Sequence, residues 1–96
     1  MKTSQIVVLN PVGLHARPAA LFVKLASEFT CEILLCNLSS AGNWVNAKSI
    51  LGLLSSGVKQ GDRIEIKAEG TDEDIAVEAL EALIRSDFRE ADNGGS

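Results

Sequence analysis

The residues best suited to chemistry lie in one stretch, GLHARPAA (residues 13–20), which contains the only histidine of the sequence, His15. Pro18 favours a helix that begins directly after His15, because proline is tolerated in a first helical turn, whose N–H groups lack intrahelical partners. The backbone amides of Ala16 and Arg17 then point towards the imidazole ring. The pattern therefore predicts a histidine at the start of a helix, beside unpaired amides and a cation.

This position gives His15 a particular electrostatic environment. The N-terminus of a helix carries about half a positive charge, and Arg17 adds a full one. Such a field disfavours the imidazolium form, so the ring stays neutral and nucleophilic, and it favours an anion beside the ring. A neutral imidazole next to such a phosphate site can accept a phosphoryl group. The more common alternative, in which His15 only caps the helix or lies at the surface, fits the spacing as well.

Two segments resemble the signatures of a known family. GLHARPA (residues 13–19) is similar to the active-site signature of HPr, the histidine phosphocarrier of the bacterial phosphotransferase system. NAKSILGLLS (residues 46–55) is similar to the second signature of that family. The similarity extends from about Ser4 to Phe88, with the same order of elements. Two signatures at the right separation favour a phosphocarrier over a merely capping histidine.

The resemblance implies a mechanism. His15 would take a phosphoryl group on Nδ1 from the phosphohistidine of enzyme I and pass it to a histidine of an enzyme IIA partner. Arg17 and the amides of Ala16 and Arg17 would hold the phosphoryl oxygens. No metal or organic cofactor is expected. Val12 stands where many relatives carry a small polar residue, so the alternative of a nitrogen-branch or regulatory carrier, acting through protein contacts, stays open.

Ser49 has two interpretations. It can cap the helix that follows it, together with Asn46, and serine is a common residue at such a position. By resemblance, it aligns with the serine that HPr kinase/phosphorylase modifies in many Gram-positive relatives. Regulatory phosphorylation of Ser49 would bring that kinase, and a transcription regulator, into the set of partners.

A surface for partner proteins is expected beside His15. In the helix of the second signature, Ile50, Leu53 and Leu54 can share a face, whereas Leu51 projects to one side of it. Exposed apolar patches commonly mark contact surfaces, and basic side chains around one attract acidic partners. The alternative is that Leu51 belongs to the core. The predicted docking residues are Ala16, Ala20, Ala47, Lys48, Leu51 and Leu54, with Arg17, Lys24 and Lys48 on the basic rim.

Composition limits the remaining possibilities. The 96 residues, of which 46% are hydrophobic, allow one domain with a modest core. A formal net charge of −4 argues against a nucleic-acid or membrane surface. The sequence has neither a secretory signal nor an apolar run long enough to cross a membrane, so we expect a cytoplasmic monomer. A small enzyme using His15 as a general base is disfavoured, because no second catalytic group accompanies it.

The pattern of apolar residues predicts alternating strands and helices. Strands are expected over residues 4–9, 32–37, 43–46 and 63–68, and helices over 16–29 and 47–56, with a last helix that starts at Thr71 as its N-cap. We expect an α+β fold of two layers, an open-faced β-sandwich. The resemblance implies an antiparallel sheet in the order 1-4-2-3 with three helices on one face. Residues 1–88 form the predicted domain, and residues 89–96 a polar, disordered tail.

Other conspicuous residues have structural explanations. Cys31 and Cys36 are five positions apart near one strand, so their side chains face opposite sides and should be buried free thiols. With one histidine, they do not make a zinc site. Trp44 is expected to cover the sheet. Ile75 is placed on the apolar face of the last helix.

Overall fold

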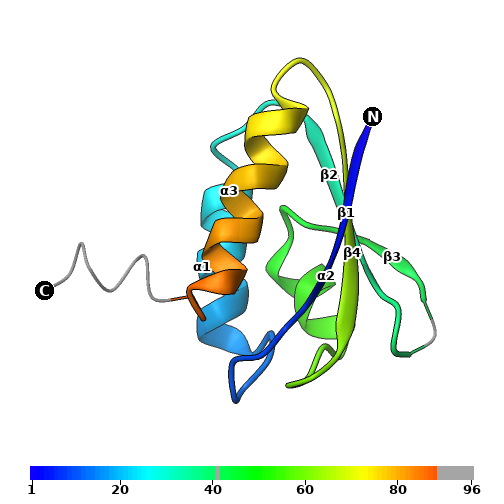
Figure 1. Ribbon diagram of the computed structural model, residues 1–96, viewed down its shortest axis with the longest axis vertical. Coiled ribbons are helices and arrows are strands. Elements are labelled where there is room, and N and C mark those ends of the chain that lie inside the picture. The colour runs from blue at the N-terminus through cyan, green and yellow to red at the C-terminus, as the bar shows by residue number, and fades with distance from the viewer. Residues whose placement is uncertain (41, 89–96) are drawn as a thin grey trace, which may run out of the picture.

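The computed structural model describes residues 1–40 and 42–88. Their elements follow the order βαββαβα (Figure 1). This order is the one that the sequence predicts. The predicted tail, residues 89–96, lies outside the described residues, so the predicted boundary between domain and tail stays a prediction. The strands are β1 (Lys2–Val7), β2 (Glu32–Asn37), β3 (Trp44–Asn46) and β4 (Arg63–Glu69), and the helices are α1 (Ala16–Ala26), α2 (Ile50–Ser55) and α3 (Glu73–Arg85).

The described strands form one antiparallel sheet in the order β1-β4-β2-β3. In the inner strand β4, Ile64, Ile66 and Ala68 are fully buried, whereas Glu65 and Lys67 between them are half-buried and Arg63 and Glu69 at the ends are exposed. This alternation is that of a sheet with one covered face. Figure 1 shows α1, α2 and α3 on the same side of the sheet. The predicted two-layer open-faced sandwich is confirmed.

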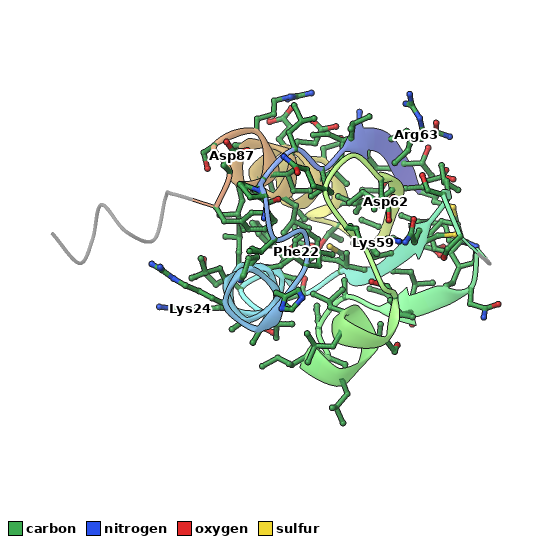
Figure 2. The ribbon with its side chains drawn as sticks, turned by 90° about the horizontal axis from the view of Figure 1, so that it is seen from below. Phe22, Lys24, Lys59, Asp62, Arg63 and Asp87 are labelled. Atoms are coloured by element: carbon green, nitrogen blue, oxygen red, sulfur yellow. The ribbon has the colours of Figure 1, made fainter. Side chains whose placement is uncertain are left out.

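The core lies between the sheet and the helices. Phe22 is completely buried and lies between α1 and the sheet (Figure 2). On α3 the buried stripe begins with Ala76 and Val77, and Ile75 is 59% exposed. The placement of Ile75 on the apolar face was therefore wrong, because it precedes the stripe by one position. The buried stripe of α3 consists of Ala76, Val77, Leu80, Leu83 and Ile84.

Two of the helices are shorter than predicted. The helix α1 ends at Ala26 because the amides of Glu28 and Phe29 bond to carbonyls only three residues back, at 3.0 and 3.2 Å, which tightens the chain out of α-helical geometry. The helix α2 starts at Ile50 because residues 46–49 form a turn, in which the carbonyl of Asn46 accepts from the amide three residues on at 3.1 Å.

The two cysteines and Trp44 lie as predicted. Both Cys31 and Cys36 are buried free thiols; Cys31 belongs to the core, whereas Cys36 is on the other face of β2. Trp44 lies on the outer face of the sheet, 40% exposed, with Nζ of Lys67 4.4 Å from the centroid of its ring. This cation–π contact covers part of the sheet face that the helices leave open.

The start of α3 is fixed by Asp72, not by Thr71 as predicted. The carboxylate of Asp72 accepts hydrogen bonds from the backbone amides of Thr30 and Cys31, at 2.8 and 2.9 Å. It therefore joins the loop after α1 to the loop before α3. The hydrogen bonds, that from Thr30 above all, favour the charged form and hold the pKa of Asp72 below its ordinary value of 3.8.

We predict that Asp72→Ala lowers the melting temperature at pH 7 by about 5 °C, because two backbone amides lose their acceptor. Since the folded-state pKa of Asp72 is lowered, its contribution is present above pH 3.8 and is lost as the pH falls further, towards the lowered value. The difference in melting temperature between variant and wild type should therefore shrink below pH 3.8.

Asp74→Ala provides the matched control, because Asp74 is an exposed carboxylate in the first turn of the same helix. Thermal unfolding followed by circular dichroism across the acid range makes the comparison. An equal loss in the Asp74 variant, or a loss in the Asp72 variant that does not change with pH, would contradict the assignment.

Candidate functional site

His15 is the N-cap residue of α1. Its backbone is extended, with φ −77° and ψ −173°, and its carbonyl accepts the amide of Ala19 at 2.8 Å. The imidazole makes no capping hydrogen bond, and the residue is exposed. The ring therefore stands at the positive end of α1 without serving the helix as a cap. This disfavours the purely capping interpretation.

A tight turn brings the chain to His15. Residues 10–13, NPVG, have the asparagine, proline and glycine that a type I turn favours at its first, second and fourth positions. The amide of Gly13 donates to the carbonyl of Asn10 at 3.1 Å, and Nδ2 of Asn10 donates to the carbonyl of Gly13 at 2.8 Å. The sequence predicted a break in the chain at Asn10 but gave no role to its side chain.

Gly13 lies against the loop between α2 and β4. Its φ is +60°, and a Cβ atom would come within 2.4 Å of the carbonyl oxygen of Val58. The same oxygen accepts the amide of Leu14 at 3.1 Å, and Leu14 is buried. Only glycine fits this approach, so the turn before His15 is held in one place.

A pocket of about 530 Å³ opens beside His15. Its walls come from the NPVG turn, from the first turns of α1, and from the end of α3. Arg17, exposed in the first turn of α1, lines the same pocket. The polar lining residues are Asn10, His15, Arg17 and Asp87, and the others are Pro11, Val12, Ala16, Pro18, Leu21 and Phe88.

The end of α3 enters the pocket through an unusual backbone conformation. Asp87 has a φ of +58°, and its amide donates to the carbonyl of Ile84 at 3.0 Å. The amide of Phe88 donates to the carbonyl of Leu83 at 2.9 Å, and the pair of bonds forms a Schellman motif. Glycine is the usual residue at the left-handed position, so an aspartate there gave no signal in the sequence. Figure 2 shows Asp87 at this end of α3.

The predicted docking residues divide into exposed and buried ones. Leu51 is 80% exposed and Leu54 40%, and Ala16 and Ala20 are also exposed. Ala47, by contrast, is completely buried, so its inclusion in an exposed patch was wrong. The reason is that the chain at this point still follows the sheet, where the amide of Ala47 donates to a carbonyl of β2 at 3.0 Å. Leu51 is not a core residue.

Lys48 does not lie on the basic rim of the docking patch, where the sequence predicted it. Its Nζ donates to the carbonyl of Phe29 at 2.7 Å, just beyond the C-terminal end of α1. A helix of 11 residues is about 16 Å long, so this ammonium group lies near the opposite end of α1 from His15. Lys48 therefore ties the turn before α2 to the end of α1 and does not border a patch beside His15. Lys24 extends from α1 into solvent (Figure 2).

Ser49 is the N-cap of α2. Its Oγ accepts the amide of Gly52 at 3.1 Å, as the capping interpretation predicts. Asn46 does not share this role, because its Oδ1 accepts the amide of Lys48 at 2.9 Å. Ser49 is half-buried, so its hydroxyl is engaged with the helix in the unmodified protein.

The described part of the chain has neither a membrane-spanning helix nor a cluster of metal ligands. No helix within residues 1–40 and 42–88 is long and apolar enough to cross a membrane. Over the same residues, no group of three or more His, Cys, Asp or Glu side chains is arranged to hold a metal ion.

Comparison with known proteins agrees with this geometry. The family model described as the PTS HPr component phosphorylation site matches residues 2–86. Phosphocarrier protein HPr of Mycoplasma pneumoniae is 49% identical over 84 residues, which cover 88% of this chain and 93% of the relative. The crystal structure of HPr from Thermoanaerobacter tengcongensis superposes with a TM-score of 0.87 at 49% identity, covering 94% of this chain and 98% of the other.

A third relative bears on the oligomeric state. Crh of Bacillus subtilis, named for catabolite repression, is 41% identical, with a TM-score of 0.69 and coverage of 91% of this chain and 97% of the other. Its crystal structure is a dimer with a swapped domain. Relatives therefore include dimers, which conflicts with the expectation of a monomer. The match of the family model over residues 2–86, together with these relatives, shows that the chain belongs to the HPr family of phosphocarriers of the phosphotransferase system.

Proposed function

We propose that this chain carries a phosphoryl group on His15 from enzyme I to an enzyme IIA of the sugar phosphotransferase system, in the cytoplasm. The observation that carries the proposal is the position of His15. It is the N-cap of α1, its imidazole is not engaged as a cap, and it shares a pocket with Arg17. The family to which the chain belongs supports the same activity.

The transfer follows from the chemistry of these groups. A lone pair of the imidazole attacks phosphorus, the P–N bond of the donor's phosphohistidine breaks, and its electron pair returns to the donor's ring. The amides of Ala16 and Arg17 are at the first two positions of α1, where they have no intrahelical acceptor. Together with the Arg17 guanidinium they bind the phosphoryl oxygens. Because a phosphohistidine is formed and another is consumed, the step is readily reversible.

We expect enzyme I and labelled phosphoenolpyruvate to phosphorylate the chain on His15, with a product that is stable to base and labile to acid. His15→Ala should carry no label, because the sequence contains no other histidine. Arg17→Glu should slow transfer at least about 100-fold, since it replaces the cation at the phosphate with an anion.

Lys24→Glu is the matched control for Arg17→Glu, because Lys24 is an exposed cation on the same helix. It should slow transfer much less than the change at Arg17. Labelling of His15→Ala to the wild-type extent would contradict the proposed function. Equal slowing by Arg17→Glu and Lys24→Glu would show that Arg17 acts only through general electrostatic attraction and does not bind the phosphoryl group.

We further propose that Ser49 is a site of regulatory phosphorylation by an HPr kinase/phosphorylase, with a transcription regulator as the partner that reads it. The resemblance of residues 46–55 to the second family signature supports this. Incubation with that kinase and ATP should modify the wild type, and Ser49→Ala should stay unmodified. The variant should also lose about 1 kcal/mol of stability, because Gly52 loses its capping oxygen. Modification of the Ser49 variant to the wild-type extent would exclude this site.

The exposed leucine of α2 supports a docking role. Leaving a leucine in water forgoes about 1.5–3 kcal/mol relative to burying it, and α2 has only six residues with which to offset that. We propose that the docking patch, defined here as Ala16, Ala20, Leu51 and Leu54, contacts enzyme I and enzyme IIA. The helices α1 and α2 that carry it pack against each other. Arg17 and Lys24 then attract acidic partner surfaces.

Leu51→Glu should weaken binding to enzyme I at least about tenfold, since a charge enters an apolar contact, while the melting temperature changes by less than about 3 °C. Isothermal titration calorimetry and thermal unfolding provide the two measurements. Ile75→Glu is the matched control, because Ile75 is an equally apolar, exposed residue on a different helix. Docking through Leu51 is excluded if both variants bind enzyme I as the wild type does, or if both weaken binding alike.

A second candidate function is a nitrogen-branch or regulatory carrier. The observation that favours it is Val12, which is 54% exposed at the pocket and supplies no polar group there. The labelled protein separates the two, because a sugar-branch carrier passes its label to enzyme IIA of that branch, whereas a regulatory carrier retains it.

A further inference from the structure

One buried polar atom lies unpaired next to the pocket. Asn10 is only 4% exposed. Its Nδ2 donates to the carbonyl of Gly13, but its Oδ1 has no hydrogen-bond partner among residues 1–40 and 42–88. No other buried side-chain oxygen or nitrogen of those residues is in this state. A buried acceptor without a donor is unfavourable, and native proteins rarely keep one without a function.

The bond to Gly13 determines what this atom can bind. If the carboxamide were turned over, its oxygen would face the carbonyl oxygen of Gly13, and two acceptors would repel each other. The remaining atom of Asn10 is therefore an acceptor, and it requires an N–H or O–H donor. A phosphoryl oxygen cannot satisfy it. Two of the side chains that border the same pocket carry N–H donors, the imidazole of His15 and the guanidinium of Arg17.

The imidazole of His15 supplies such a donor. A neutral imidazole has one N–H group and one lone pair, and phosphoryl transfer uses the lone pair. Which nitrogen keeps the proton is set by the hydrogen bond that this N–H makes. Of the side chains that line the pocket, two carry acceptor oxygens, Asn10 and Asp87. Water solvates the exposed Asp87, whereas the oxygen of Asn10 is buried.

We propose that Asn10 is a positioning residue for His15, whose imidazole N–H is accepted by the Asn10 carboxamide oxygen. The ring then presents the lone pair of its other nitrogen to phosphorus. No capping bond holds the exposed His15 ring, and His15 and Asn10 line the same pocket. During transfer the N–P bond forms on one nitrogen while the proton stays on the other. The consequence for transfer rests on the proposed function, but the tautomer is a property of the unphosphorylated chain.

Long-range ¹H–¹⁵N correlation spectra of the imidazole, recorded where it is neutral, test this directly. Their signals belong to His15 without ambiguity, because it is the only histidine. One tautomer should dominate in the wild type. In Asn10→Ala the ratio of tautomers should fall at least about threefold, whereas Asn10→Asp, which keeps an acceptor oxygen, should retain the wild-type preference.

Two matched variants separate positioning from a general loosening of the turn. Gln60→Ala removes another bond to this segment, from Nε2 of Gln60 to the carbonyl of Leu9 at 3.1 Å, and should leave the tautomer ratio unchanged. Asp87→Asn should leave it unchanged as well. An unchanged tautomer ratio in Asn10→Ala would overturn the proposal. A change of the ratio in Asp87→Asn instead would also overturn it, because Asp87 would then be the residue that accepts the imidazole N–H.

The rate of phosphorylation by enzyme I gives the second readout. Asn10→Ala should slow it about tenfold, and Asn10→Asp should restore most of the rate, because the acceptor returns. If Asn10→Ala does not fold, Asn10→Asp provides the test. This variant loses the N–H that donates to the carbonyl of Gly13 but keeps an acceptor oxygen, so a changed tautomer ratio in it would contradict the proposal. If enzyme I does not phosphorylate His15, the proposed function is contradicted, whereas the tautomer ratio still tests the hydrogen bond from His15 to Asn10.

Discussion

The close approach of Gly13 to the carbonyl of Val58 is the constraint on which the site depends. A Cβ atom would lie 2.4 Å from that oxygen, so the backbone of the NPVG turn sits directly on the loop that leads into β4. The amide of Leu14 bonds to the same oxygen, and Leu14 is buried behind it. The chain therefore has no freedom in how it enters α1. The direction of α1, and the place of His15 at its N-terminus, follow from a packing contact with the loop that leads into β4.

The distribution of charge differs among α1, α2 and α3. Acidic residues are concentrated on α3, which carries Glu73, Asp74, Glu78 and Glu81, and the net charge of the chain is −4. The helices next to His15 are different: α1 carries Arg17 and Lys24, and α2 has no charged residue. The surface of α1 and α2 is thus more positive than that of α3. Under the proposed function, long-range attraction to an acidic partner would orient the carrier, and such an attraction weakens with salt.

The sequence predicted the periodic parts of the fold well and the ends of its elements poorly. The alternation in β4 and the spacing along α1 reflect burial on one side, which the residue types reveal. The end of α1, the start of α2 and the cap of α3 depend instead on bonds between distant segments. Asp72 bonds to Thr30 and Cys31, and Lys48 to Phe29, and no local pattern announces such pairs. For the same reason, the sequence placed His15 and Arg17 together but missed Asp87, which the fold brings to the pocket from the end of α3. Asn10 was missed although it is close in sequence, because its side-chain bond lies within the NPVG turn.

The exposure of His15 and of Leu51 illustrates why a carrier differs from an enzyme that works alone. An enzyme encloses its substrate so that preorganised groups act without water. Here His15 is exposed, and Leu51 is 80% exposed on a helix too short to be stable by its own propensity. The exposed Leu51 does not stabilise the isolated domain, because its apolar surface stays in water. Under the proposed function, a partner that covers this face would bury Leu51 and exclude water from the phosphoryl group on His15. Under the proposed function, a complex with the partner completes the catalytic environment, and this chain contributes the His15 ring, the Arg17 cation and the amides of Ala16 and Arg17.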